Sequence, residues 1–70
     1  MNIYKKIKKD FVLVDVNDVK IGDIIKIQST KTNKFVTKSC FVDKIVDNKI
    51  HLQHGGNLNL VFEIDSLTLI

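Results

Sequence analysis

The spacing of apolar residues changes near residue 10 of the chain. Before that point Ile3, Tyr4 and Ile7 recur at intervals of three and four residues with lysines around them, which predicts one face of a short helix. Because so short a helix is unstable alone, residues 1–10 are predicted to form a basic N-terminal segment, either helical and packed on the protein or flexible. From residue 11 onward apolar residues recur at every second position, which is typical of β-strands.

Turn-forming residues divide this second region into short strands. The strands are expected near residues 11–16, 24–29, 35–45, 49–53, 58–62 and 67–70. Gly22 is expected to take a positive φ at one turn, and Asp47 with Asn48 to close a tight hairpin in left-handed conformations. Gly55 and Gly56 are expected to relax the next reversal.

The stretch DVKIGDIIKI, residues 18–27, begins one of these strands. The aliphatic side chains expected to alternate into the core are Val19, Ile21, Ile25 and Ile27. Asp23 is expected to accept hydrogen bonds from nearby backbone amides, while Lys26 and Gln28 face outward. The stretch therefore predicts a turn followed directly by a half-buried strand.

This stretch resembles the "hydrophobic, any residue, hydrophobic, Gly, Asp, hydrophobic" segment of SH3-like small barrels, including the translation-factor and KOW types. The resemblance continues in LNLVFEIDSLTLI, which looks like a strand, one 3₁₀ turn at EIDS and a last short strand. It covers about 50 residues at the level of the fold, and it implies no particular ligand. It implies one all-β domain over residues 11–70, a small SH3-like barrel of five to six short antiparallel strands.

The predicted strands differ in how cleanly their two faces separate. In residues 58–64 the residues sharing the apolar face are Leu58, Leu60, Phe62 and Ile64, and Ile50 with Leu52 alternate in the same way with His51 and Gln53. Residues 11–16 are apolar on both faces, with Phe11 and Leu13 on one of them. Both faces must then be covered, either by the N-terminal segment or by a second copy in a homodimer.

The predicted strand at 35–45 also leaves two alternatives open. If Val36, Cys40 and Val42 face inward, Phe35 and Phe41 are displayed on the sheet beside lysines, as a base-stacking platform requires. If a β-bulge switches the faces, both phenylalanines turn inward. The second alternative is favoured, because aromatic residues in a chain of 70 residues are more often core than display.

The positive charge of the chain is concentrated near its N-terminus. The formal net charge is +3, but four of the eleven lysines lie at positions 5, 6, 8 and 9. The other seven lysines against eight acidic residues leave the rest of the chain at −1. Arginine is absent, which disfavours specific reading of bases, and the abundance of Ile and Asn is typical of an AT-rich genome.

The sequence gives no support for catalysis, a metal or a cofactor. Cys40 is expected to be a reduced, packed thiol, and no serine lies in a nucleophile motif. His51 and His54 are expected to be surface residues, because no further ligands complete a zinc site. The segment HGGNLN lacks the lysine and the helix of a phosphate-binding loop.

The sequence therefore predicts a non-enzymatic binding module in the cytoplasm that does not insert into membranes. The first hypothesis is a protein-interaction regulator or inhibitor from a low-GC bacterium, its phage or a mobile element, with an interface at Phe11, Leu13, Phe35 and Phe41. The second hypothesis is nucleic-acid binding through a set of lysines that would also suit an acidic partner. These lysines are Lys5, Lys6, Lys8, Lys9, Lys31, Lys34 and Lys38. A third is capture of a small ligand at an oligomer interface near His51 and His54.

Overall fold

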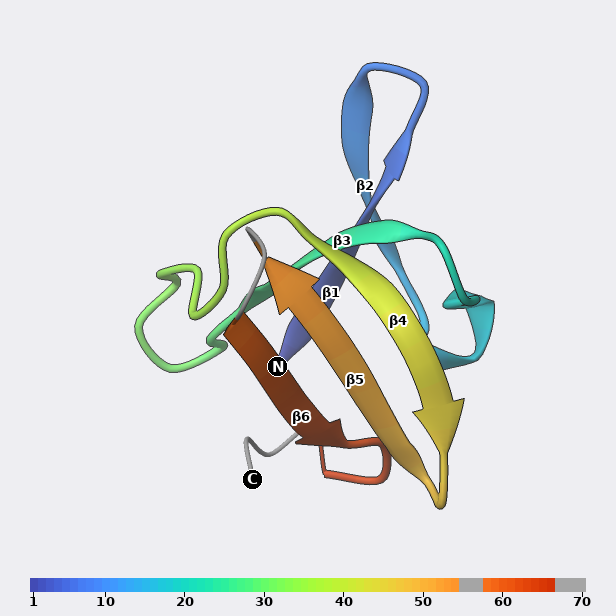
Figure 1. Ribbon diagram of the computed structural model, residues 1–70. Coiled ribbons are helices and arrows are strands. Elements are labelled where there is room, and N and C mark those ends of the chain that lie inside the picture. The colour runs from blue at the N-terminus through green and yellow to red at the C-terminus, as the bar shows by residue number, and fades with distance from the viewer. Residues whose placement is uncertain (55–57, 67–70) are drawn as a thin grey trace.

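The described part of the chain forms a single antiparallel β-sheet. The computed structural model describes residues 1–54 and 58–66 (Figure 1). The strands are β1 (Asn2–Ile7), β2 (Asp10–Val14), β3 (Ile24–Gln28), β4 (Cys40–Val46), β5 (Lys49–His54) and β6 (Leu58–Glu63). Their order in the sheet is β2-β1-β3-β4-β5-β6, so β2 and β6 are the two edges. The all-β prediction is confirmed.

Helical structure is almost absent from the described residues. They contain one short 3₁₀ helix, η1 (Val16–Asp18), capped by the Asp15 carboxylate, which accepts a hydrogen bond from the Val16 amide at 2.8 Å. No helix of this part of the chain is long and apolar enough to cross a membrane. The 3₁₀ turn expected at EIDS is observed as an ordinary turn over residues 64–66.

The prediction that residues 1–10 are helical or flexible is wrong. Residues 2–7 form β1, which pairs along one side with β2 and along the other with β3. Ile3 lies between Val14 and Ile27 and is buried. Pairing on both sides of the strand outweighs the local spacing of Ile3, Tyr4 and Ile7, because propensity in a short segment is a weak preference.

One face of the curved sheet encloses the hydrophobic core. Its buried hydrophobic residues are Ile3, Val19, Ile25, Ile27, Cys40, Val42, Ile50, Leu52 and Phe62. Leu60 and Ile64 pack against this cluster, so the alternation expected along β5 and β6 is confirmed at these positions. The inward positions of Ile25 and Ile27 are confirmed as well, whereas Ile21 was wrongly assigned to the core because it is 65% exposed.

At the positions that the structure describes, the turns have the backbone conformations expected from the sequence. Gly22 has a φ of 92°, and Asp47 and Asn48 have φ values of 53° and 61° in the β4–β5 hairpin. The Gly22 amide donates to the Val42 carbonyl at 2.8 Å, which ties this turn to β4. The expected turn at residues 55–56 and the expected strand at 67–70 lie outside the described residues.

The predicted strand at 35–45 is a strand only in its second half. β4 begins at Cys40, and the preceding segment is held to β3 by Thr37, whose buried hydroxyl accepts a hydrogen bond from the Ile27 amide at 3.0 Å. Within β4 the pairing with β5 shifts between Val42 and Lys44, which places a β-bulge at Asp43. Cys40 and Val42 therefore face inward before the bulge, and Ile45 packs on the core after it.

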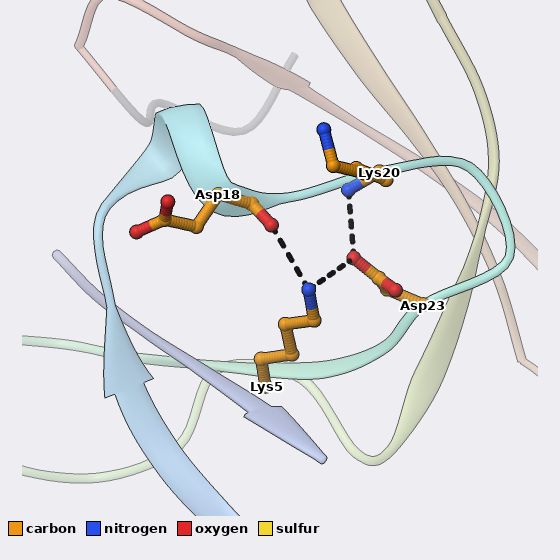
Figure 2. Close-up of polar contacts among 4 residues, drawn as sticks. All are labelled: Lys5, Asp18, Lys20 and Asp23. Carbon is orange, nitrogen blue, oxygen red and sulfur yellow. Dashed lines mark hydrogen bonds and ion pairs between the residues drawn. The ribbon is translucent and has the colours of Figure 1, made fainter. Parts of the chain in front are cut away.

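The connection from β2 to β3 crosses over β1. Both strands are antiparallel to β1, so they run in the same direction on its two sides, and residues 15–23 must pass over it. Figure 2 shows the Lys5 side chain of β1 reaching this connection. Its Nζ lies 3.1 Å from the Asp18 carbonyl oxygen, to which it donates, and 3.1 Å from Asp23 Oδ2. Asp23 Oδ2 also accepts a hydrogen bond from the Lys20 amide at 2.7 Å, which confirms the role expected for Asp23.

We predict that Lys5→Met destabilises the protein, because it removes the cation that joins β1 to the crossover. The Lys5 and Asp23 side chains are 22% and 20% exposed, so the pair is partly screened by solvent. We expect the free energy of unfolding to fall by about 1 kcal/mol. Denaturation in urea measures it. The control Lys44→Met, on the exposed surface of β4, should change stability by less than about 0.5 kcal/mol, and equal losses in both variants would contradict this role of Lys5.

Candidate functional site

The outer face of strands β1 to β4 carries a continuous group of aromatic, aliphatic and lysine side chains. We call it the aromatic–lysine face, and its members are Tyr4, Lys6, Phe11, Leu13, Ile24, Lys26, Phe35 and Phe41. On the strands these residues alternate with positions on the core face. Cross-strand pairing brings Tyr4 opposite both Leu13 and Lys26, and it brings Ile24 opposite Phe41. None of the eight residues is acidic.

Lys26 lies at the centre of one half of this face. Its Nζ lies 4.3 Å from the centroid of the Phe11 ring and 5.3 Å from that of the Phe35 ring. Tyr4 contacts the same Phe35 ring edge to face, with centroids 5.6 Å apart. An exposed cation–π contact is worth about 0.5–1 kcal/mol, so Lys26 holds both phenylalanine rings while remaining positively charged.

The other half of the face contains a shallow hollow. Lys6, Phe11, Ile24 and Phe41 line it, and its volume is about 250 Å³. Lys6 and Phe11 are cross-strand neighbours on the β1–β2 hairpin. The lining of the hollow also includes Cys40 and the polar residues Ser39, Gln53 and His54, so the hollow combines apolar side chains with polar groups and the positive charge of Lys6.

Phe35 and Phe41 are both displayed, and the favoured expectation that they turn inward is wrong. Phe35 is 48% exposed and Phe41 is 43% exposed. A bulge does switch the faces of β4, as that alternative required, but it lies at Asp43 and so comes after Phe41. Cys40 and Val42 take the inward positions instead, while Val36 is exposed in the segment before the strand.

The lysines proposed from the sequence fall in three places. Lys5 makes the crossover contacts with Asp18 and Asp23, and its role toward a nucleic acid or acidic partner stays a prediction. Exposed lysines on the projecting β1–β2 hairpin are Lys6, Lys8 and Lys9 (Figure 1). Exposed lysines between β3 and β4 are Lys31, Lys34 and Lys38.

The loop that carries Lys31 and Lys34 is closed by its own hydrogen bonds. The Ser29 amide donates to the Lys34 carbonyl at 2.8 Å, and the Ser29 hydroxyl accepts from the Lys31 amide at 3.2 Å. Asn33 takes a φ of 60° at its tip. These contacts give both lysines a defined backbone position at the end of the sheet.

Three residues of the aromatic–lysine face, Tyr4, Ile24 and Lys26, were missed from the sequence. Tyr4 was assigned to the apolar side of a helix, and Lys26 was recognised only as outward-facing. The alternation in β3 places Lys26 outward, but its rings come from β2 and from the segment before β4. Placing these residues on one face requires the pairing of β1 with both β2 and β3, which the sequence pattern does not reveal.

The histidines lie away from any group that resembles a metal site. Among residues 1–54 and 58–66 there is no cluster of three or more His, Cys, Asp or Glu side chains suited to an ion. His54 Nδ1 lies 3.0 Å from the Ser39 carbonyl oxygen, to which it donates in the tautomer with hydrogen on Nδ1. His51 pairs across the sheet with Val61. The geometry of both histidines is that of sheet residues.

Cys40 is buried in the core and is not part of a disulfide. Burial raises the pKa of its thiol, and a hydrogen bond with the Thr37 side chain offsets part of that rise. A thiol with a raised pKa is a weak nucleophile at neutral pH. The expectation of a packed thiol is confirmed.

Comparison of the chain with protein-family models, with curated proteins and with solved structures gave no match.

We predict that burial of Cys40 makes stability decrease at alkaline pH. The thiol pKa is raised above its ordinary value of 9.0 in the folded state only, so the unfolded chain ionises first and stability falls as pH rises through 9.0. The stability advantage of the wild type over Cys40→Ala should narrow by up to about 1 kcal/mol between about pH 8 and about pH 10. Urea denaturation of both proteins measures it, and a constant difference would contradict the burial of the thiol.

Proposed function

We propose that this protein is a non-enzymatic binding module, a regulator or inhibitor whose aromatic–lysine face docks on another protein. The observation that carries the proposal is that Phe35, Phe41 and Leu13 are each exposed by 43% or more on one face whose charged members are all lysines. Large aromatic side chains contribute most of the energy of protein interfaces when they become buried. A partner surface with apolar pockets and nearby carboxylates fits this chemistry.

The arrangement around Lys26 favours a protein partner over stacked bases. The Lys26 ammonium already covers the Phe11 and Phe35 rings, so a base stacking on either ring must displace it. Stacking is worth about 1–3 kcal/mol per base, and loss of the cation–π contact removes about 0.5–1 kcal/mol of it. A carboxylate beside the rings instead adds an ion pair to Lys26 without displacing it.

We further propose that the curved sheet corresponds to a small SH3-like barrel. The nearly equal extents of 27, 25 and 23 Å support this, because a flat sheet of six strands is much thinner in one direction. The natural setting that we propose is a cytoplasm, where the single thiol of Cys40 stays reduced.

Nucleic-acid binding is the second candidate, and one observation favours it. Lys6, Lys8 and Lys9 are exposed on the β1–β2 hairpin, which also bears Phe11 of the aromatic–lysine face. A single strand that follows the hairpin would meet lysines and then aromatic rings, the combination used by proteins that bind without sequence preference.

The protein-docking proposal predicts site-specific cross-linking. A benzophenone amino acid placed at Phe41 should capture a partner protein in cells that carry the gene, and Lys26→Glu should reduce that capture severalfold. The matched control is the same amino acid at Val46, which is 44% exposed against 43% for Phe41 and lies near the β4–β5 turn. Equal adducts at both positions, or none at Phe41, would refute the proposal.

The nucleic-acid candidate predicts a strong dependence on salt. If four lysines of the hairpin and face neutralise phosphates, the logarithm of the affinity for single-stranded oligonucleotides should fall with a slope of about −2.8 against the logarithm of salt concentration. Replacing Lys6, Lys8 and Lys9 by Gln should bring that slope to about −0.7, whereas Lys44→Gln should leave it unchanged. Fluorescence anisotropy measures the slope, and binding that is insensitive to salt excludes this mechanism.

A further inference from the structure

Among residues 1–54 and 58–66, no strand pairs with the backbone groups of the outer edge of β2. β2 pairs with β1 on one side and is the first strand in the sheet order. In an antiparallel ladder alternate residues of an edge strand turn both N–H and C=O away from the sheet. Figure 1 shows the β1–β2 hairpin projecting beyond the other strands.

The hydrogen bonds of β3 identify which residues of β2 turn outward. The Ile27 amide donates to Thr37 Oγ1 and the Ile27 carbonyl accepts from the Val36 amide, so both groups point away from β1. Ile3, which lies opposite Ile27, must therefore direct its own backbone groups to Val14 on β2. By alternation Asp10 and Val12 also bond to β1, and Phe11 and Leu13 turn their N–H and C=O outward.

The side chains along this edge do not protect it against pairing. Val12 is 43% exposed and Leu13 is 56% exposed, on opposite faces of β2. Edge strands are usually guarded by lysine or proline, but the sequence of β2 is DFVLV, whose one charged residue is at its end. The opposite edge, β6, carries Asn59 and Glu63. β2 is thus the edge suited to accept another strand.

We propose that β2 pairs antiparallel with β2 of a second copy of this chain, with Val12 on the two-fold axis. In this register the outward N–H and C=O of Phe11 bond to those of Leu13 of the second copy. The same register brings Lys9 near Asp15 of the second copy, and both residues are exposed in the single chain. Phe11, Val12 and Leu13 then meet apolar residues and Lys9 meets an opposite charge, while Asp10 faces Val14.

Neighbouring registers do not give this match. Centring the pair on Phe11 places Lys9 opposite Leu13 of the second copy, and centring it on Leu13 places Phe11 opposite Asp15. Each of these sets at least two charged residues of one copy against apolar residues and forms no opposite-charge pair, whereas the register centred on Val12 sets only Asp10 against Val14. Charge complementarity therefore selects the register with Val12 at the centre.

This dimer would join two aromatic–lysine faces into one surface. Phe11 and Leu13 lie on the outer face, and each would meet the other residue of the second copy across the axis. A partner protein would then encounter a face of twice the length with residues from both chains. This consequence rests on the proposed function, whereas the pairing itself depends only on β2.

The test of the pairing combines sedimentation with cysteine cross-linking. Wild-type protein should sediment as a dimer at high concentration, and Leu13→Lys should be a monomer. Val46→Lys, a lysine at a similarly exposed site on β4, should remain a dimer. A monomer at every concentration for the wild type overturns the proposal, and circular dichroism verifies that each variant is folded.

Cross-linking tests the register. In a Cys40→Ala background Val12→Cys should form an intermolecular disulfide on oxidation, because facing residues on the axis have Cα atoms about 4.5 Å apart. Leu13→Cys should not, because its counterpart lies beyond disulfide reach. Equal cross-linking at both positions overturns this register. If the protein is a monomer but cross-links to a partner at Phe41, the proposed pairing fails and the proposed function stands. If it is a dimer that gives no such adducts, the pairing stands and the proposed function fails.

Discussion

The position of β1 between β2 and β3 is the constraint on which the rest of the molecule depends. Because β1 is antiparallel to both neighbours, the chain must cross over it to begin β3, and Lys5 holds that crossover through Asp18 and Asp23. The same placement turns Tyr4 and Lys6 to the outer face and leaves β2 as an edge. β1 thus contributes both to the closure of the hydrophobic core and to the proposed binding surfaces.

Much of the sheet was predictable from the alternation of residues beyond position 10. The positions of β5 and β6, the left-handed turn at Asp47 and Asn48, and the positive φ of Gly22 all follow from local chemistry. β1 was not predictable in this way, because its apolar spacing also fits a helix and only distant pairing decides between them. Ile21 was misplaced for a similar reason: the turn at Gly22 rotates the chain before β3 begins.

The surface proposed for binding was predictable in part. Phe11, Leu13, Phe35 and Phe41 were identified from strands with two apolar faces, and the structure places all four on the aromatic–lysine face. The contribution of Lys26 depends on rings from two other segments, so no local pattern reveals it. Conversely, Lys5 belongs to a run of similar lysines in the sequence, and only the crossover distinguishes it from Lys6.

The bulge at Asp43 changes the phase of the inward–outward alternation partway along β4. Residues before it place odd-numbered side chains outward, and residues after it place an odd-numbered side chain, Ile45, against the core. Removing the bulge while keeping all residues would put β4 in a single phase, so that either Phe41 or Ile45 would change sides. The bulge and the residue count of β4 are therefore linked: a chain that lacks the bulge keeps Phe41 outward and Ile45 inward only if it is one residue shorter between Val42 and Ile45.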